Sequence, residues 1–230
     1  MDKTAVIVFL LGPPGSGKGT QAARLARETG LTPISTGELL RRESDSGSPL
    51  GLQVRSLLNA GLLVDDDLMN EVVAKRLSDM DCRQGCLLDG YPRTIEQARF
   101  LQSFLYSHGL EEPIVFDFVV SPEQVIERLS QRRQCPTCGQ IYSAEFDVYG
   151  KDLSCANDGT PLVRRTDDNP ETIRERLRIY QGKTLDLVAF YEPRRYFEID
   201  AMQSPDTIGT RLLSLLDNST VPMVLRCSTL

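Results

Sequence analysis

The stretch Gly12-Pro13-Pro14-Gly15-Ser16-Gly17-Lys18-Gly19-Thr20 directly follows an apolar run from Ala5 to Leu11. An apolar strand that ends in G-x-x-x-x-G-K is typical of the loop that holds phosphate groups in P-loop nucleotide enzymes. Its glycines let backbone N–H groups turn inward around an anion, and the next helix directs the positive end of its dipole there. Lys18 adds an ammonium group that reaches the β- and γ-phosphates. We therefore expect the chain to bind a nucleoside polyphosphate through Gly15, Ser16, Gly17, Lys18, Gly19 and Thr20.

The rest of the chain alternates strand-like and helix-like segments. Strands are expected at residues 6–11, 31–34, 86–89, 114–120 and 196–199. Helices are expected at residues 19–28, 37–46, 49–59, 66–79, 94–107, from 121, 169–191 and from 204. The last three begin with Ser or Asn followed by Pro and an acid, a strong helix-start signal. This order predicts an α/β fold of P-loop NTPase type, a parallel sheet with helices on both faces.

Composition limits the kind of protein this can be. The 230 residues are 40% hydrophobic and 25% charged, ordinary values for a soluble globular protein with one α/β core and a small inserted module. No apolar run approaches the roughly 20 residues that span a bilayer, and no signal peptide precedes the first strand, so we expect a cytoplasmic protein without membrane contact. The net charge of −6 argues against a nucleic-acid partner.

The segment 131–168 breaks the alternation and carries a predicted metal site. Cys135 and Cys138 form a C-x2-C pair, and Cys155 and Asp158 form a C-x2-D pair, the spacing of two zinc knuckles with one carboxylate ligand. A segment this small has too little core to fold alone, so bound Zn²⁺ would supply its folding free energy. Four protein ligands leave no open position, which indicates a structural metal. Two alternatives are a coincidental grouping in a loop and a nucleic-acid module.

Further motifs offer phosphate and magnesium ligands. Asp89 ends a buried strand in the sequence DGYPRT and is expected to position Mg²⁺ through its water shell. The sequence STGELLR at residues 35–41 offers a hydroxyl and a guanidinium. Arginines also cluster at both ends of the segment 131–168, and these are Arg128, Arg132, Arg133, Arg164, Arg165, Arg174 and Arg176.

Together the sequences GPPGSGKGTQA, STGELLR, LLDGYPRT, QRR and RRTDDNPETIRERL resemble adenylate kinase, a nucleoside monophosphate kinase family, in its long form with a metal-binding lid. The resemblance covers residues 6–217 in order. It implies a core of residues 1–34, 65–130 and 169–217, a segment 35–64 that binds the nucleoside monophosphate, and a lid of residues 131–168. The tail 218–230 has no counterpart.

The resemblance also implies roles for individual residues. The catalytic set is Lys18, Arg93, Arg128, Arg132, Arg165 and Arg176. ATP is held by the P-loop residues together with Arg128, Arg132, Tyr142 and Gln203. AMP is held by Thr36, Arg41, Leu62, Val64, Gly90, Arg93, Gln97, Arg165 and Arg176. The metal set is Cys135, Cys138, Cys155 and Asp158. The chain departs from the family at Glu38 and Tyr91, often Asp and Phe, and near Asp200 to Gln203, where the usual Gly and Lys are absent.

The implied reaction is ATP + AMP ⇌ 2 ADP with Mg²⁺, catalysed by a monomer that maintains the adenine nucleotide balance. Thr94 and Gln97 are expected to select adenine, because UMP/CMP kinases usually carry Asn at the position of Thr94 and Gln97 can make a two-point hydrogen bond to the base. Asp167 and Asp168 either orient the arginines or form plain salt bridges. The alternatives are a UMP/CMP-type kinase, a P-loop hydrolase and a non-catalytic adenine-nucleotide sensor.

Overall fold

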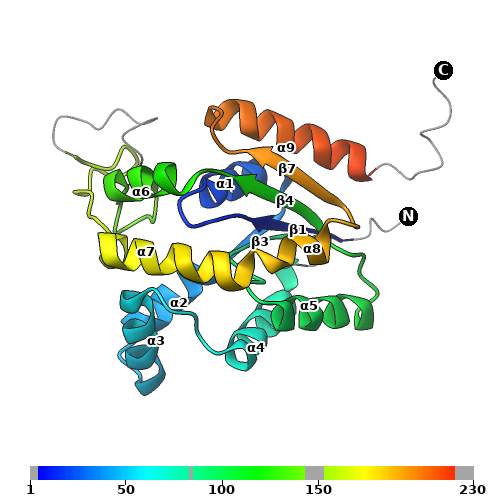
Figure 1. Cartoon of the computed structure of the whole chain (residues 1–230), viewed down its shortest axis with the longest axis horizontal. Helices are drawn as coiled ribbons and strands as arrows, with labels where there is room; N and C mark the ends of the chain where they lie inside the picture. Colours follow the sequence, from blue (N-terminus) through cyan, green and yellow to red (C-terminus); the bar gives the residue numbers. More distant parts are fainter. Residues whose placement is uncertain (1–4, 83–84, 143–152, 221–230) are drawn as a thin grey trace.

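The computed structural model describes residues 5–82, 85–142 and 153–220. A five-stranded parallel sheet lies at its centre, with the strand order β2-β3-β1-β4-β7 (Figure 1). The strands are β1 (Val6–Leu11), β2 (Thr32–Ser35), β3 (Gly85–Asp89), β4 (Ile114–Val119) and β7 (Tyr196–Asp200). The sequence predicted all five to within one residue at each end, and the predicted α/β fold is confirmed.

Strand β1 is the middle of the sheet because its sequence VIVFLL offers apolar side chains to both faces. It pairs in parallel with β3 and with β4, so that Leu10 stands beside Asp89 and Leu11 beside Asp117. Strand β2 continues the sheet, with Ser35 also beside Asp89. The carboxyl ends of β1, β2 and β3 therefore meet at one edge, where open parallel sheets bind ligands.

Helices bury both faces of the sheet (Figure 1). One face packs against α1 (Lys18–Thr29) and α9 (Pro205–Thr220), with Leu25 and Leu212 fully buried between them. The other face packs against α4 (Asp66–Leu77), α5 (Ile95–Ser107) and α8 (Asp186–Tyr191), around Phe9 and Leu88. Burial of apolar surface on both faces is the main stabilising term of this core.

The remaining helices lie next to the ligand-binding edge. Helices α2 (Thr36–Asp45) and α3 (Pro49–Ala60) form a contacting pair after β2. Helices α6 (Pro122–Gln131) and α7 (Pro170–Ile179) flank the segment 131–168, hereafter the insert. Ser121 and Asn169 cap these two helices by accepting hydrogen bonds from backbone N–H groups, as their sequence predicted.

Two expectations about helices are wrong in part. The helix expected at 169–191 is interrupted between α7 and α8 by a π-helical segment, η3 (Tyr180–Thr184). A tail is also expected at residues 218–230, but residues 218–220 belong to α9, which continues to Thr220, and residues 221–230 lie outside the described residues. The described residues also form two short 3-10 turns, η1 (Met80–Cys82) and η2 (Thr166–Asp168).

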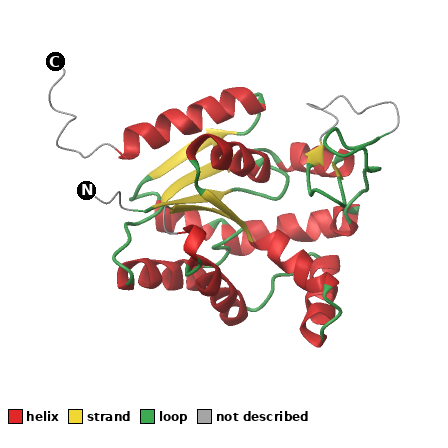
Figure 2. Ribbon diagram, turned by 180° about the vertical axis from the view of Figure 1, so that it is seen from behind, coloured by secondary structure: helices red, strands yellow, loops and turns green. Residues whose placement is uncertain are grey.

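Among its described residues, the insert contains η2 and a small two-stranded antiparallel sheet, β5 (Arg133–Gln134) and β6 (Ile141–Tyr142). Figure 2 shows it to one side of the main sheet. Within the described part of the chain, no helix is long and apolar enough to cross a membrane.

Candidate active site

A cleft of about 460 Å³ opens at the carboxyl edge of the sheet, between the P-loop and the insert. Seven basic residues and two acidic ones are among the described residues that line it. The basic residues are Lys18, Arg41, Arg93, Arg128, Arg132, Arg165 and Arg176, and the acidic ones are Glu38 and Asp89. In a chain whose net charge is −6, this local excess of positive charge indicates a site for a strongly anionic ligand.

The P-loop wraps around an anion-sized space at the start of α1. Gly15 and Gly17 adopt positive φ angles of 76° and 95°. A Cβ at Gly15 would lie 2.8 Å from Leu129 Cγ, so only glycine fits this turn. Residues 15–20, at the amino end of α1, all line the cleft.

The Lys18 side chain is held over the P-loop by hydrogen bonds to the loop's own oxygen atoms. Its Nζ donates to the carbonyl oxygens of Gly12 and Pro13 at 2.8 and 2.7 Å, and to Ser16 Oγ at 3.2 Å. Burial lowers the pKa of the Lys18 ammonium to about 8, although Asp89 opposes this shift. A cation that is short of hydration binds a phosphate more strongly than one in open solvent.

Asp89 ends β3 next to the P-loop helix. A Cβ placed on Gly19 would lie 3.5 Å from Asp89 Oδ2. The variation that puts Gly rather than a hydroxyl residue directly after Lys18 therefore keeps room beside this carboxylate. The arrangement fits a magnesium ion held through water, with Thr20 also on the cleft wall.

The seven arginines that cluster in sequence separate in space. Arg128, Arg132, Arg165 and Arg176 line the cleft, and the other three do not. Arg133 donates to the carbonyl oxygen of Arg132 at 2.9 Å, and Arg164 donates to that of Asp168. Arg174 is exposed on α7. The resemblance distinguished these two groups, whereas the clustering alone did not.

Two buried carboxylates orient the cleft arginines. Asp168, with no exposed surface on its side chain, accepts two hydrogen bonds from Arg132, from Nε at 2.8 Å and Nη2 at 2.5 Å. Asp167 accepts one from Arg176 Nη1 at 3.0 Å. A two-point contact of this kind fixes a guanidinium in plane and direction. The two alternatives for Asp167 and Asp168, groups that orient the arginines or plain salt bridges, thus describe the same contacts.

The cleft arginines stay positively charged although they are largely buried. Desolvation and the nearby Arg132 lower the pKa of Arg165 to about 9, and desolvation lowers the pKa of Arg176 to about 10. Both remain protonated at neutral pH. Burial alone would raise the pKa of Asp167, but Arg176, Arg132 and Arg41 outweigh it and hold the value below normal.

A smaller second cavity adjoins the cleft on the side of α2 and α3. It is lined by every residue that the resemblance assigns to AMP except one: Thr36, Arg41, Leu62, Val64, Gly90, Arg93, Gln97 and Arg176. The exception, Arg165, lines the main cleft. Thr36 Oγ1 donates to the Gly90 carbonyl at 2.9 Å, and Arg93 Nε donates to the same oxygen at 2.8 Å.

Thr94 and Gln97, the two residues expected to select adenine, differ in their relation to the second cavity. Thr94 caps α5, is buried and lines neither cavity, so it does not contact a base there directly. Gln97 does line the second cavity, but Asp66 and the backbone of Arg93 already hold its amide. Sequence reasoning missed Asp66, because three consecutive acids at a helix start, residues 65–67, are fully explained as capping.

Two more residues of the cleft wall were missed. Tyr180 and Thr184 line it from the π-helical segment η3, and Thr184 Oγ1 donates to the Arg93 carbonyl at 3.0 Å. A π-helical turn often marks a functional site, but the sequence showed only continuous helical periodicity at this point.

Tyr142 is predicted to lie near ATP, and here its side chain is engaged within the insert. Its neighbour Ile141 lines the cleft instead. Since successive side chains of a strand point to opposite faces, Tyr142 faces the metal cluster. Its hydroxyl lies 3.3 Å from Cys155 Sγ and accepts from the Ala156 N–H at 2.8 Å. Gln203, by contrast, does line the cleft, near Arg128.

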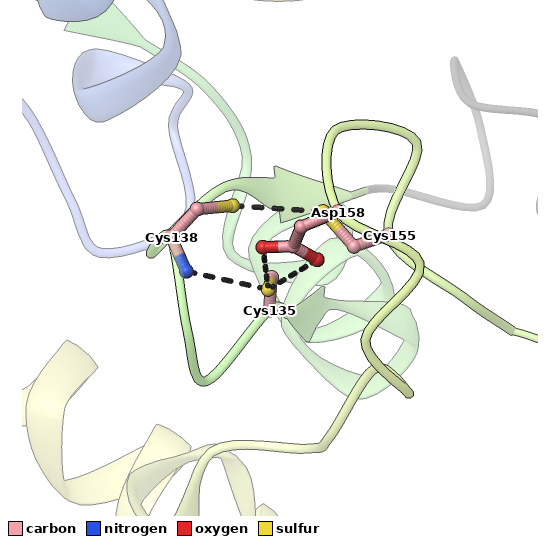
Figure 3. A group of neighbouring side chains, drawn as sticks. All are labelled: Cys135, Cys138, Cys155 and Asp158. Atoms are coloured by element: carbon pink, nitrogen blue, oxygen red, sulfur yellow. Dashed lines mark hydrogen bonds between the residues drawn. The ribbon is translucent and has the colours of Figure 1, made fainter.

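The four predicted metal ligands come together in the insert (Figure 3). One ligand atom from each of Cys135, Cys138, Cys155 and Asp158 lies within 4.8 Å of the others. The Sγ atoms of Cys138 and Cys155 are 3.5 Å apart. A tetrahedral ion with bonds of about 2.3 Å to sulfur needs sulfur atoms about 3.8 Å apart, so the cluster fits zinc.

The backbone of each knuckle supports the same conclusion. Gly139 N–H donates to the Cys135 carbonyl at 3.0 Å, and Gly159 N–H donates to the Cys155 carbonyl at 2.9 Å. The two turns are thus alike, although one ends in a thiol and the other in a carboxylate. Hydrogen bonds from Thr160 lower the pKa of Asp158 to about 2, which keeps it ionised as a metal ligand requires.

Comparison with known proteins agrees with this site. The family pattern described as adenylate kinase matches residues 10–196. An adenylate kinase of Pyrococcus furiosus is 39% identical over 211 residues, 91% of this chain and 95% of that protein. One from Anaeromyxobacter sp. (strain Fw109-5) is 44% identical over 189 residues, covering 82% and 88%. One from Kosmotoga olearia is 39% identical over 212 residues, covering 92% and 99%.

Proposed function

The chain belongs to the adenylate kinase family, and on that premise we propose how its residues carry phosphoryl transfer from ATP to AMP. The reaction is ATP + AMP ⇌ 2 ADP, and it balances the adenine nucleotides. The observation that carries the proposal is the convergence of Lys18 and six arginines on one cleft with a second cavity beside it. A P-loop hydrolase has no use for that second cavity.

We assign the ATP half of the site to the P-loop and the base of the insert. The amides of residues 15–20 and the Lys18 ammonium bind the phosphate chain, and Arg128 and Arg132 face it from α6 and its end. Asp89 would hold Mg²⁺ through water, and the ion, when bound, neutralises charge on the β- and γ-phosphates. Gln203 lies where the loop after β7 reaches the cleft. Tyr142, in the insert, stays a predicted ATP contact.

The AMP half is the second cavity. Arg41 and Arg93 bind the phosphate, while Thr36, Leu62, Val64 and Gly90 form the walls around the nucleoside. Burial lowers the pKa of Arg93 but leaves it charged. Gln97 contacts the base with the part of its amide that the protein does not use. This division requires the AMP phosphate to point toward Lys18.

The transfer itself needs no base from the protein, because the attacking group is an AMP phosphate oxygen that is already ionised. Lys18, Arg93, Arg128, Arg132, Arg165 and Arg176 bind the transferred group. Their charges are placed before the reaction, by backbone carbonyls for Lys18 and by Asp167 and Asp168 for Arg176 and Arg132. Such fixed charge stabilises the transition state without a cost of reorganisation.

The three-part division follows from the same assignment. Residues 1–34, 65–130 and 169–217 form the core, 35–64 the AMP segment and 131–168 the lid. Water competes with AMP as acceptor, so the lid has to cover the cleft before transfer and uncover it afterwards. Ile141 of the insert reaches within 4.0 Å of where a Cβ on Gly19 would lie. Zinc, when bound by the four ligands, supplies the folding free energy of this lid.

We further propose that the enzyme is a cytoplasmic monomer with ATP, AMP and ADP as its ligands, and with neither nucleic acid nor a membrane as partner. Product analysis tests the whole assignment. The protein is given Mg-ATP with AMP, CMP, UMP, GMP or no acceptor, and nucleotides are separated by ion exchange. Fast ADP formation with AMP alone supports it. Preference for CMP or UMP indicates a pyrimidine kinase, loss of ATP without acceptor a hydrolase, and no turnover a sensor.

A further inference from the structure

A polar contact next to the AMP cavity has no place in the mechanism above. Asp66, the first residue of α4, accepts a hydrogen bond from Gln97 Nε2 at 2.6 Å through Oδ1. Its other oxygen, Oδ2, accepts from the Thr94 hydroxyl at 2.8 Å. The carboxylate thus connects the start of α4 to the start of α5, the helix that carries the base-contacting amide.

These contacts allow only one orientation of the Gln97 amide. An ionised carboxylate only accepts hydrogen bonds, so the end of the amide that faces Asp66 must be the NH₂ group. The other end, Oε1, accepts from the Arg93 backbone N–H at 2.8 Å, and an N–H only donates. A flipped amide would place its oxygen against the Asp66 carboxylate and its NH₂ group against the Arg93 N–H. Both hydrogen bonds would be replaced by repulsive contacts.

The surroundings leave the amide no other way to adapt. Gln97 is 2% exposed. Its N–H donates to the Thr94 hydroxyl oxygen at 3.2 Å, and its carbonyl accepts from Tyr91, whose hydroxyl also donates to Asn70. Backbone and side chain are therefore both fixed. One N–H of Nε2 and one lone pair of Oε1 remain for a ligand in the second cavity.

A donor and an acceptor in fixed order distinguish the two purine types. The amide oxygen accepts from the amino group of adenine, and the amide N–H donates to the neighbouring ring nitrogen. Hypoxanthine and guanine present the reverse order, a carbonyl and a ring N–H, and would need the flipped amide. We propose that Asp66 is a positioning residue that sets the choice of acceptor base by fixing the orientation of Gln97. This inference rests on the proposed function.

The test compares two acceptors in Asp66→Asn. IMP differs from AMP in having a carbonyl at C6 in place of the amino group, and its neighbouring ring nitrogen therefore carries a proton. The two acceptors are nearly the same size, so a difference in their rates does not come from the size of the base. Asparagine offers one acceptor and one donor, and Thr94 can donate or accept, so the flipped amide is then opposed only by the Arg93 backbone N–H. We expect the ratio of kcat/KM for AMP to that for IMP to fall about tenfold or more. Asp67→Asn removes the same charge from an exposed neighbour in the same helical turn and should leave the ratio unchanged.

The outcomes separate the possible failures. A purely structural role for Asp66 would lower the melting temperature and both kcat/KM values while keeping their ratio, and that result overturns the inference. Asp66→Ala, which leaves only the Arg93 contact, gives the same test if Asp66→Asn does not fold. Wild-type protein without turnover on any acceptor would contradict the proposed function itself. If the wild type prefers AMP and both Asp66 variants keep the same preference, the result would contradict only the inference about Asp66.

Discussion

The active-site cleft has one wall formed by the sheet and one formed by the insert, and the two walls are stabilised by different interactions. On the sheet side, the strand residues that carry the P-loop and Asp89 are almost fully buried, with Val8, Leu87 and Leu88 at 0% exposure. On the insert side, the buried residues among 133–142 and 153–163 are Cys135 and Cys155. Both are predicted metal ligands. The first wall is stabilised by its apolar core, and we propose that the second is stabilised by the metal that these ligands bind.

This difference explains how one enzyme can be rigid where charge must be placed and movable where ligands must enter. Preorganised groups need a scaffold that does not relax, which the sheet supplies. A lid needs to stay folded while it moves as a unit, and a metal centre achieves this without the apolar surface that would anchor it to the core. Each prediction below changes one wall and leaves the other as its control.

The largest effect is expected at the rigid wall, from Lys18→Met. The substitution removes the ammonium that faces the transferred phosphoryl group, and kcat should fall about 10³-fold. The fold should be unaffected, because the lost contacts are to the loop itself. Steady-state kinetics and the thermal midpoint check this, with exposed Lys75→Met as the charge-matched control. A decrease of less than tenfold would remove Lys18 from the catalytic set.

The next effect is expected where the two walls join, from Asp168→Asn. The amide cannot form both charged hydrogen bonds to Arg132, whose side chain is 12% exposed against 0% for Asp168. We expect about 3 kcal/mol less stability and, with Arg132 displaced, about 10²-fold lower kcat. Glu175→Gln breaks the pair with Arg178, which is 72% exposed, and should cost under about 1 kcal/mol. Equal losses in chemical denaturation of the two variants would contradict this account.

A smaller effect on activity is expected when the movable wall loses its metal. Cys138→Ser, or a chelator, should reduce kcat roughly tenfold, less than a change inside the cleft. The share of ATP that is hydrolysed rather than transferred should rise, because the loosened lid admits water. Metal content by mass spectrometry and the ratio of phosphate to ADP report both effects. Thr137→Ser, in the same turn of the insert, is the control and should change neither.

The smallest effect is a pH dependence of the rigid wall. Since burial lowers the pKa of Lys18 to about 8, the free enzyme loses this charge as the pH rises above 8. We expect kcat/KM for ATP to fall above that pH, while kcat persists to higher pH because bound phosphate favours the charged form. In Lys18→Arg the fall near pH 8 should be absent, and the residual activity should fall only from about pH 9, where Arg165 begins to lose its charge. A profile for the wild type that stays flat to pH 10 would contradict the assignment.

Much of the rigid wall could be predicted from the sequence. Short, largely apolar runs of four to seven residues located each strand to within one residue at each end. Parallel order then brought Gly15 and Asp89 to the same edge, because the carboxyl ends of such strands converge. The grouping of Cys135, Cys138, Cys155 and Asp158 was equally predictable, since their spacing follows from the size of one metal-binding turn.

What could not be predicted depends on contacts between distant segments. The link from Asp66 to Gln97 joins two helix starts that are 31 residues apart, and each residue has a sufficient local explanation. The contact of Tyr142 with Cys155 was not predicted, because the register of a two-residue strand has no periodicity to reveal it. The π-helical segment η3 was missed because one additional residue per turn leaves the apolar pattern almost unchanged.

Hydrogen exchange with and without zinc tests the contrast between the two walls most directly. The full chain is prepared with one equivalent of zinc and again after chelation, and amide protection is followed by mass spectrometry of peptides. The account predicts that 133–142 and 153–163 lose their protection in the zinc-free protein, while β1 and β3 keep theirs. Loss of protection in β1 and β3 as well, or unchanged protection in the insert, would contradict it.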